Sequence, residues 1–122
     1  MVASQTVSAS VASHGNGVNM SIAITTSEGA GATRVACAGE VDVSNASELR
    51  DALNQALEGA PQTLEVDLSA VSYIDSTGIG VLVGVAHHAK DESVVFKVLR
   101  PQRNVERIMG ILGVDAELRV ER

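Results

Sequence analysis

Aromatic side chains are almost absent from this sequence of 122 residues, which has one phenylalanine, one tyrosine and no tryptophan. Proteins that bind single-stranded nucleic acid stack its bases on aromatic rings, and tight flat interfaces commonly rely on Trp or Tyr anchors. The scarcity of aromatics argues against both functions. Because hydrophobic residues still make up 45% of the chain, we expect one aliphatic core of Val, Leu, Ile and Ala.

Basic residues are also few. Nine Lys and Arg stand against 15 Asp and Glu, which gives a formal net charge of −6. Duplex binders gain affinity by placing Lys and Arg on phosphates, so the charge argues against a nucleic-acid partner. A basic surface on a partner protein is compatible with it.

Disulfides and membrane segments are not expected either. The single cysteine, Cys37, allows no internal disulfide and gives no sign of an oxidising compartment. The sequence has no run of eighteen apolar residues that could span a bilayer, and its start lacks the pattern of a signal peptide. We therefore expect a cytoplasmic protein without a membrane part.

The hydrophobic pattern predicts a single α/β domain. Residues 1–18 are rich in Ser, Ala, Val and Gly without clear periodicity, and we expect a mobile tail there before a domain over residues 19–122. Alternation and helical spacing predict the order β-β-α-β-α-β-α-β and a mixed sheet. The expected strands are 19–25, 33–39, 63–68 continued by 71–74, 93–99 and 117–120, and the expected helices are 45–58, one from residue 77 onward and 101–112.

Local signals fix where the elements begin and end. Residues 39–43 are predicted to form a connecting loop. Asn45, with Glu48 three residues later, is a variant of the capping box that starts a helix. In the helix from residue 77, apolar residues recur at the spacing of one buried face, at Ile79, Leu82, Val83 and Ala86.

Ser76 lies between the strand that ends near Ile74 and the helix that begins near Thr77. A serine in this place is a natural N-cap, because its hydroxyl oxygen accepts a hydrogen bond from the first helical turn. The same place also suits a phosphate, which is stabilised by the free N–H groups and partial positive charge of a helix start. Phosphorylation would add about −1.5 to −2 charges, and Gly78 would leave room for another protein to approach.

Asp42 and Asp75 each follow a predicted strand. If these two strands are parallel, both carboxylates lie at the same end of the sheet. The simpler interpretation is that each carboxylate is solvated in its loop or caps a local turn.

Two segments carry a family resemblance. They are residues 39–44, Gly-Glu-Val-Asp-Val-Ser, and residues 71–84, Val-Ser-Tyr-Ile-Asp-Ser-Thr-Gly-Ile-Gly-Val-Leu-Val-Gly. Together they resemble the anti-sigma factor antagonists, which consist of a STAS domain, and above all the general-stress antagonists of anti-sigma-B. The similarity extends over about residues 19–121 and includes Leu112-Gly113-Val114 at the end of the last helix.

The resemblance implies a partner-switching cycle for transcription under stress. The unphosphorylated protein would bind an anti-sigma factor, a serine kinase with a histidine-kinase-like ATPase fold, and so release a sigma factor. That kinase would use ATP and Mg²⁺ to phosphorylate Ser76, and a PP2C-type phosphatase would restore binding. The chain itself would be no enzyme and would need no cofactor or metal.

The family motif also implies the surface that meets the partner. Thr77 stands where many members have a second serine, so it is expected as a minor phosphorylation site, and the tail is longer than usual. The implied contact residues are Asp42, Ser44, Asp75, Ser76, Thr77, Gly78 and Ile79.

Two other functions fit parts of the sequence. A hydrolase triad of Ser76 with His87 or His88 fails on distance, because eleven or twelve helical residues at about 1.5 Å each separate them by about 16 to 18 Å. The Gly-x-Ser-x-Gly elbow of many hydrolases is missing as well. The second alternative is a STAS scaffold subunit of a larger signalling assembly, which would assemble with itself rather than bind an ATPase-fold partner one to one.

Overall fold

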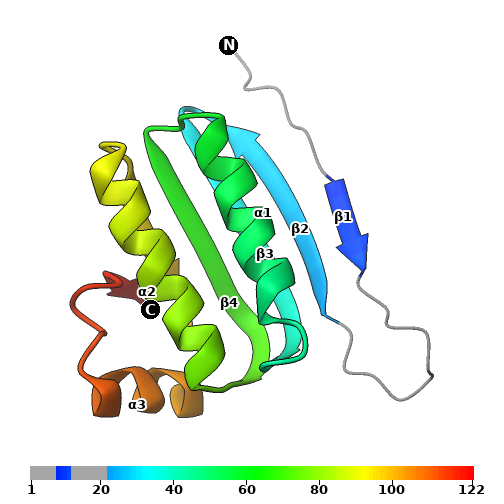
Figure 1. Cartoon of the computed structure of the whole chain (residues 1–122), viewed down its shortest axis with the longest axis vertical. Coiled ribbons are helices and arrows are strands. Elements are labelled where there is room, and N and C mark those ends of the chain that lie inside the picture. The colour runs from blue at the N-terminus through cyan, green and yellow to red at the C-terminus, as the bar shows by residue number, and fades with distance from the viewer. Residues whose placement is uncertain (1–7, 12–21) are drawn as a thin grey trace.

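The computed structural model describes residues 8–11 and 22–122 of the chain. Three strands come first, and from there each helix is followed by a strand (Figure 1). In chain order the elements are β1 (Ser8–Val11), β2 (Ala23–Gly29), β3 (Ala32–Val41), α1 (Ala46–Glu58), β4 (Thr63–Ile74), α2 (Ser76–Asp91), β5 (Val95–Leu99), α3 (Arg103–Leu112) and β6 (Val120–Glu121).

The strands form one six-stranded sheet in the order β1-β2-β3-β4-β5-β6. The pairs β1–β2 and β2–β3 are antiparallel, and the pairs β3–β4, β4–β5 and β5–β6 are parallel. Each parallel pair is joined by one helix, because parallel neighbours need a crossover connection. The predicted α/β class with a mixed sheet is therefore confirmed, with one more strand than the pattern indicated.

Helices α1 and α2 lie side by side on the same face of the sheet (Figure 1). Helix α1 buries the predicted stripe of Leu49, Leu53 and Leu57, and α2 buries Ile79 and Leu82. Burial of one such side chain contributes about 2 kcal/mol, so the helices are held on the sheet mainly by this aliphatic core. Within the described ranges, no helix is both long enough and apolar enough to cross a bilayer.

Helix α3 lies at the end of the sheet where β4 ends (Figure 1). Its Asn104 Nδ2 donates a hydrogen bond of 2.9 Å to the carbonyl oxygen of Ser72 in β4. Met109 is fully buried, as its place in the apolar stripe predicts, but Leu112 is 47% exposed. The stripe therefore reaches the core only in the first two turns of α3.

Strands β3 and β4 are longer than predicted. Residues 39–43 were expected to form a loop, but β3 continues to Val41, and β4 is one continuous strand up to Ile74. The β3–β4 ladder shifts register after Ala36 and again after Gly39, whose φ of 114° is accessible mainly to glycine. Such bulges interrupt the alternation of apolar and polar side chains. The alternation in the sequence therefore predicts strands that end before the real ones do.

The start of the chain differs from the predicted tail in one stretch. Residues 8–11 form β1, which pairs with β2 from Ser8 opposite Thr26 to Val11 opposite Ala23. An edge strand of this kind is held by backbone hydrogen bonds and needs no apolar pattern of its own. The remainder of the predicted tail, residues 1–7 and 12–18, lies outside the described residues, as do residues 19–21 of the first predicted strand.

Burial of the Cys37 thiol predicts a loss of stability at alkaline pH. Burial disfavours the thiolate and raises the pKa of Cys37 from 9.0 to about 11. Because the folded state holds this proton more tightly, the stabilisation is complete below the unfolded pKa and is lost as the pH rises through the folded pKa. The loss amounts to about 3 kcal/mol.

Urea unfolding at a series of pH values measures this effect, with Cys37→Ala as the control. The variant has no thiol to ionise, so its free energy of unfolding should fall less steeply over the alkaline range than that of the natural protein. Parallel curves for the two proteins would show that the thiol does not contribute.

Candidate functional site

The site begins where β3 and β4 end beside each other. Val41 and Ile74 are register partners in the parallel ladder, and the N–H of Asp75 donates a hydrogen bond of 3.1 Å to the carbonyl oxygen of Val41. Asp42 and Asp75 therefore leave the same end of the sheet from adjacent strands. This is the arrangement that the parallel pairing predicted.

Asp75, not Ser76, is the N-cap of α2. Its Oδ1 accepts a hydrogen bond of 3.0 Å from the N–H of Gly78, and its carbonyl oxygen accepts the first helical bond, from Ile79. The prediction that Ser76 caps the helix is wrong by one residue. An N-cap side chain accepts a hydrogen bond from the N–H of the third helical residue, which for Asp75 is Gly78. A carboxylate is also a stronger acceptor than a hydroxyl.

Ser76 is therefore the first residue of α2, and its side chain is exposed. The first N–H groups of a helix have no intrahelical acceptor. Asp75 satisfies the N–H of Gly78, and those of Ser76 and Thr77 have no hydrogen-bond acceptor in the part of the chain that the structure describes. The Ser76 hydroxyl thus lies beside two free donors and the positive end of the helix dipole.

Asp42 shapes the loop opposite this turn. Its Oδ1 accepts hydrogen bonds from the N–H of Ser44 at 2.9 Å and from the Ser44 hydroxyl at 2.6 Å. These two bonds lower the pKa of Asp42 below its ordinary value, because they stabilise the charged form. Asp42 is therefore an ionised carboxylate at neutral pH.

The buried side chain of Asn45 also holds the loop that contains Asp42. Its side chain is fully buried, with Oδ1 accepting from the N–H of Asp42 and Nδ2 donating to the carbonyl oxygen of Glu40, each at 2.9 Å. Helix α1 does begin after Asn45, as predicted, but its side chain makes no hydrogen bond to the first turn of the helix. Asn45 is thus the N-cap residue of α1, as predicted, but its side-chain amide holds the preceding loop.

Gly78 and Ile79 lie beneath the turn rather than on its surface. Both are buried, and a Cβ on Gly78 would come within 2.6 Å of Ile74 Cγ1 and 2.8 Å of Val41 Cγ1. The missing side chain therefore serves close packing of α2 on the two strand ends, not access for a partner as the sequence suggested. Gly78 and Ile79 therefore position the turn, and their contact with a partner stays a prediction.

The exposed part of the site forms one small surface, which we call the serine face. Ser44, Ser76 and Thr77 are exposed, and Asp42 and Asp75 are half-buried. Val43 was missed by the sequence reasoning, although an apolar residue between two polar ones in a loop was a signal; it is 75% exposed. The serine face consists of Asp42, Val43, Ser44, Asp75, Ser76 and Thr77.

The histidines of α2 do not join the serine face. His87 Nε2 is hydrogen-bonded to Glu117 Oε2, and His88 Nδ1 lies 3.4 Å from Asn54 Oδ1 in α1. Both are most of the length of α2 away from Ser76, so no triad is assembled. Within residues 8–11 and 22–122, no group of His, Cys, Asp and Glu is arranged to hold a metal ion.

Comparison with known proteins points to one family. The family model described as Mlab, STAS domain, matches residues 24–120. The anti-sigma-F factor antagonist RsfB of Mycobacterium tuberculosis is 28% identical over 100 residues, covering 82% of this chain and 81% of that protein. The anti-sigma-B factor antagonist of Bacillus subtilis is 36% identical over 81 residues, covering 66% and 73%.

Solved structures share the fold. An anti-sigma factor antagonist from Mycobacterium paratuberculosis superposes with a TM-score of 0.69 at 22% identity, covering 95% of this chain and 86% of that one. The Bacillus cell fate determinant SpoIIAA in its phosphorylated form gives a TM-score of 0.58 at 18% identity, covering 75% and 82%. These similarities establish the fold of the chain.

The packing of Gly78 predicts opposite effects for two glycines of α2. Gly78→Ala should lower the free energy of unfolding by about 1 to 3 kcal/mol, because the new Cβ clashes with Ile74 and Val41. Gly80→Ala is the matched control: a Cβ there meets nothing within 4 Å, so it should leave stability unchanged or raise it by up to about 1 kcal/mol. Urea unfolding measures both, and equal effects would contradict the packing argument.

Proposed function

The chain belongs to the STAS domain family, and we propose that it is an anti-sigma factor antagonist switched off by phosphorylation of Ser76. The observation that carries this proposal is the exposed Ser76 hydroxyl at the first position of α2, fixed against the ends of β3 and β4. The names of the relatives support the antagonist role. In this role the chain is a binding partner and a substrate, not an enzyme.

The serine face supplies what a kinase substrate needs. Ser76 is exposed, yet its backbone is held by the cap of Asp75 and the close packing of Gly78. A hydroxyl in a fixed position loses little conformational freedom when it enters another protein's active site. We infer that the kinase is the anti-sigma factor itself, with a histidine-kinase-like ATPase fold, and that a PP2C-type phosphatase reverses the reaction. Thr77, also exposed, is a second and minor acceptor.

Phosphorylation would change the charge of the serine face more than its shape. The phosphate adds about −1.5 to −2 charges close to the carboxylates of Asp42 and Asp75. The free N–H groups of Ser76 and Thr77 offer it hydrogen bonds at the start of the helix. The helix can therefore hold the phosphate, while a partner fitted to the unmodified face meets repulsion and an added bulk.

Val43 gives the same face an apolar contact. It is 75% exposed in the loop that Asp42 and Asn45 hold rigid. An exposed apolar side chain in a fixed loop is suited to close packing against a partner protein. A phosphate on Ser76 would hold the partner away from Val43. We propose that the anti-sigma factor contacts Val43 together with Ser76.

Substitutions at Ser76 test the switch. After incubation with the cognate kinase and ATP, mass mapping should find phosphate on Ser76, with at most a minor fraction on Thr77. Ser76→Ala should bind the anti-sigma factor as the natural protein does and resist inactivation. Ser76→Asp should bind at least about tenfold more weakly, a loss of about 1.4 kcal/mol.

The matched control for this test is Ser93→Asp, which adds the same charge just beyond the other end of α2. It should bind normally. Phosphate found only at other sites would overturn the assignment of Ser76, and normal binding by Ser76→Asp would leave the serine with no switching role. Size-exclusion chromatography of the mixture distinguishes a one-to-one complex from the large self-assemblies of a scaffold.

The helix-start position of Ser76 predicts that phosphorylation spares the fold. Circular dichroism of the phosphorylated protein should match that of the unmodified protein. Its melting temperature should shift by no more than a few degrees, about 1 kcal/mol. A large loss of helical signal would contradict the proposed placement of the phosphate at the start of α2.

A further inference from the structure

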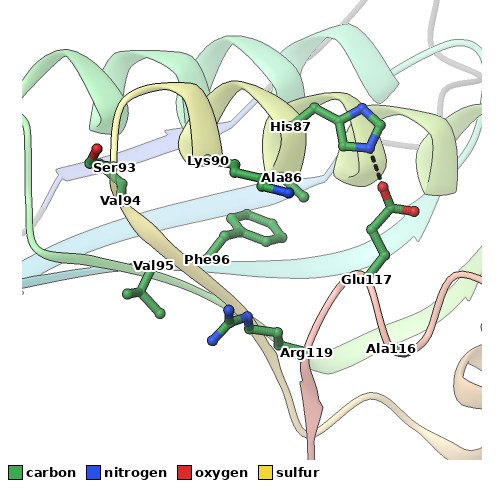
Figure 2. A pocket seen from close by; sticks show the side chains of 10 residues that line it. All are labelled: Ala86, His87, Lys90, Ser93, Val94, Val95, Phe96, Ala116, Glu117 and Arg119. Carbon is green, nitrogen blue, oxygen red and sulfur yellow. Dashed lines mark hydrogen bonds and ion pairs between the residues drawn. The ribbon is translucent and has the colours of Figure 1, made fainter.

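A pocket of about 520 Å³ lies at the other end of α2, away from the serine face. It is bounded by the last turns of α2, by β5 and by the segment that precedes β6 (Figure 2). Lys90 is fourteen residues from Ser76, about 21 Å along the helix. The volume is within the range of about 300 to 1,000 Å³ typical of small-ligand sites.

The base of this pocket is apolar. It contains the ring of Phe96, the one phenylalanine of the chain, which is only 5% exposed, and the side chains of Ala86 and Val94 (Figure 2). An aromatic ring at the bottom of a pocket favours a flat apolar group placed against it. The pocket therefore offers a surface for the non-polar body of a ligand.

Two cations without a partner line the walls of the pocket. Lys90 comes from α2 and Arg119 from the segment before β6 (Figure 2), and neither forms an ion pair among the described residues. The third basic group, His87, is already bound to Glu117, and this pair joins α2 to the opposite wall. Lys90 and Arg119 are thus available to an anion.

We propose that this pocket binds a small organic anion, a phosphate or carboxylate on a compact flat apolar body. The anionic group lies between Lys90 and Arg119, and the apolar body rests on Phe96. The acidic residues nearest in sequence to Lys90 are Asp91 and Glu92, which are exposed and do not line the pocket. Glu117, which does line it, has its carboxylate hydrogen-bonded to His87 rather than to Lys90 or Arg119.

Phenyl phosphate is the probe that tests this site, titrated into the whole protein and followed by two-dimensional NMR. It should shift the signals of Phe96, Lys90 and Arg119, with a dissociation constant on the order of 1 mM. Inorganic phosphate, which lacks the apolar body, and benzyl alcohol, which lacks the charge, should each bind at least about tenfold more weakly.

Charge variants distinguish binding in the pocket from non-specific attraction of the anion to basic residues elsewhere on the surface. The double variant Lys90→Gln, Arg119→Gln lacks both cations and should bind phenyl phosphate at least about tenfold more weakly. Arg107→Gln removes an exposed charge from α3 outside the pocket and should leave binding unchanged. Equal binding by the double variant, no shifts at the pocket, or equal affinity for inorganic phosphate would each overturn the proposal. No anti-sigma partner is used, so the result is independent of the proposed function.

Discussion

The hydrogen bond from Asp75 to the carbonyl oxygen of Val41 joins the two strand ends on which the serine face depends. It continues the parallel ladder one step beyond Ile74, so the chain enters α2 from a fixed position. Asp75 is then placed to cap the helix, and Ser76 follows as its first residue. The position of the exposed hydroxyl is therefore set by the sheet rather than by the loop around it.

Close packing and exposure are divided between neighbouring residues of the same motif. Gly78 touches Val41 and Ile74 so closely that no side chain fits there, while Ser76 and Thr77, one or two residues earlier, face outward. Across the sheet end, buried Asn45 has the corresponding role under the loop of Asp42. Rigid buried neighbours allow an exposed site to be recognised in one conformation, at a small entropic cost to the partner complex.

The two ends of α2 differ in electrostatic character. At its start, the carboxylate of Asp75 caps the helix beside the free N–H groups of Ser76 and Thr77, and Asp42 follows the adjacent strand. A phosphate on Ser76 would add negative charge there. At its end, the cations Lys90 and Arg119 flank the Phe96 pocket. Because about 21 Å of helix separates them, a small anion and a protein partner could be bound together.

The sequence alone determined the α/β class, the order of helices and strands from residue 23 onward and the shared location of Asp42 and Asp75, because these follow from periodicity and parallel pairing. It also identified Ser76 as the residue on which the proposed switch turns. Tertiary structure decided which residue caps α2, because the hydrogen bond from Asp75 to Val41 fixes where β4 ends and the helix begins. It likewise decided that Gly78 packs inward and that Phe96, Lys90 and Arg119 meet in one pocket. Contacts between residues distant in sequence leave no local pattern, so only the folded chain reveals them.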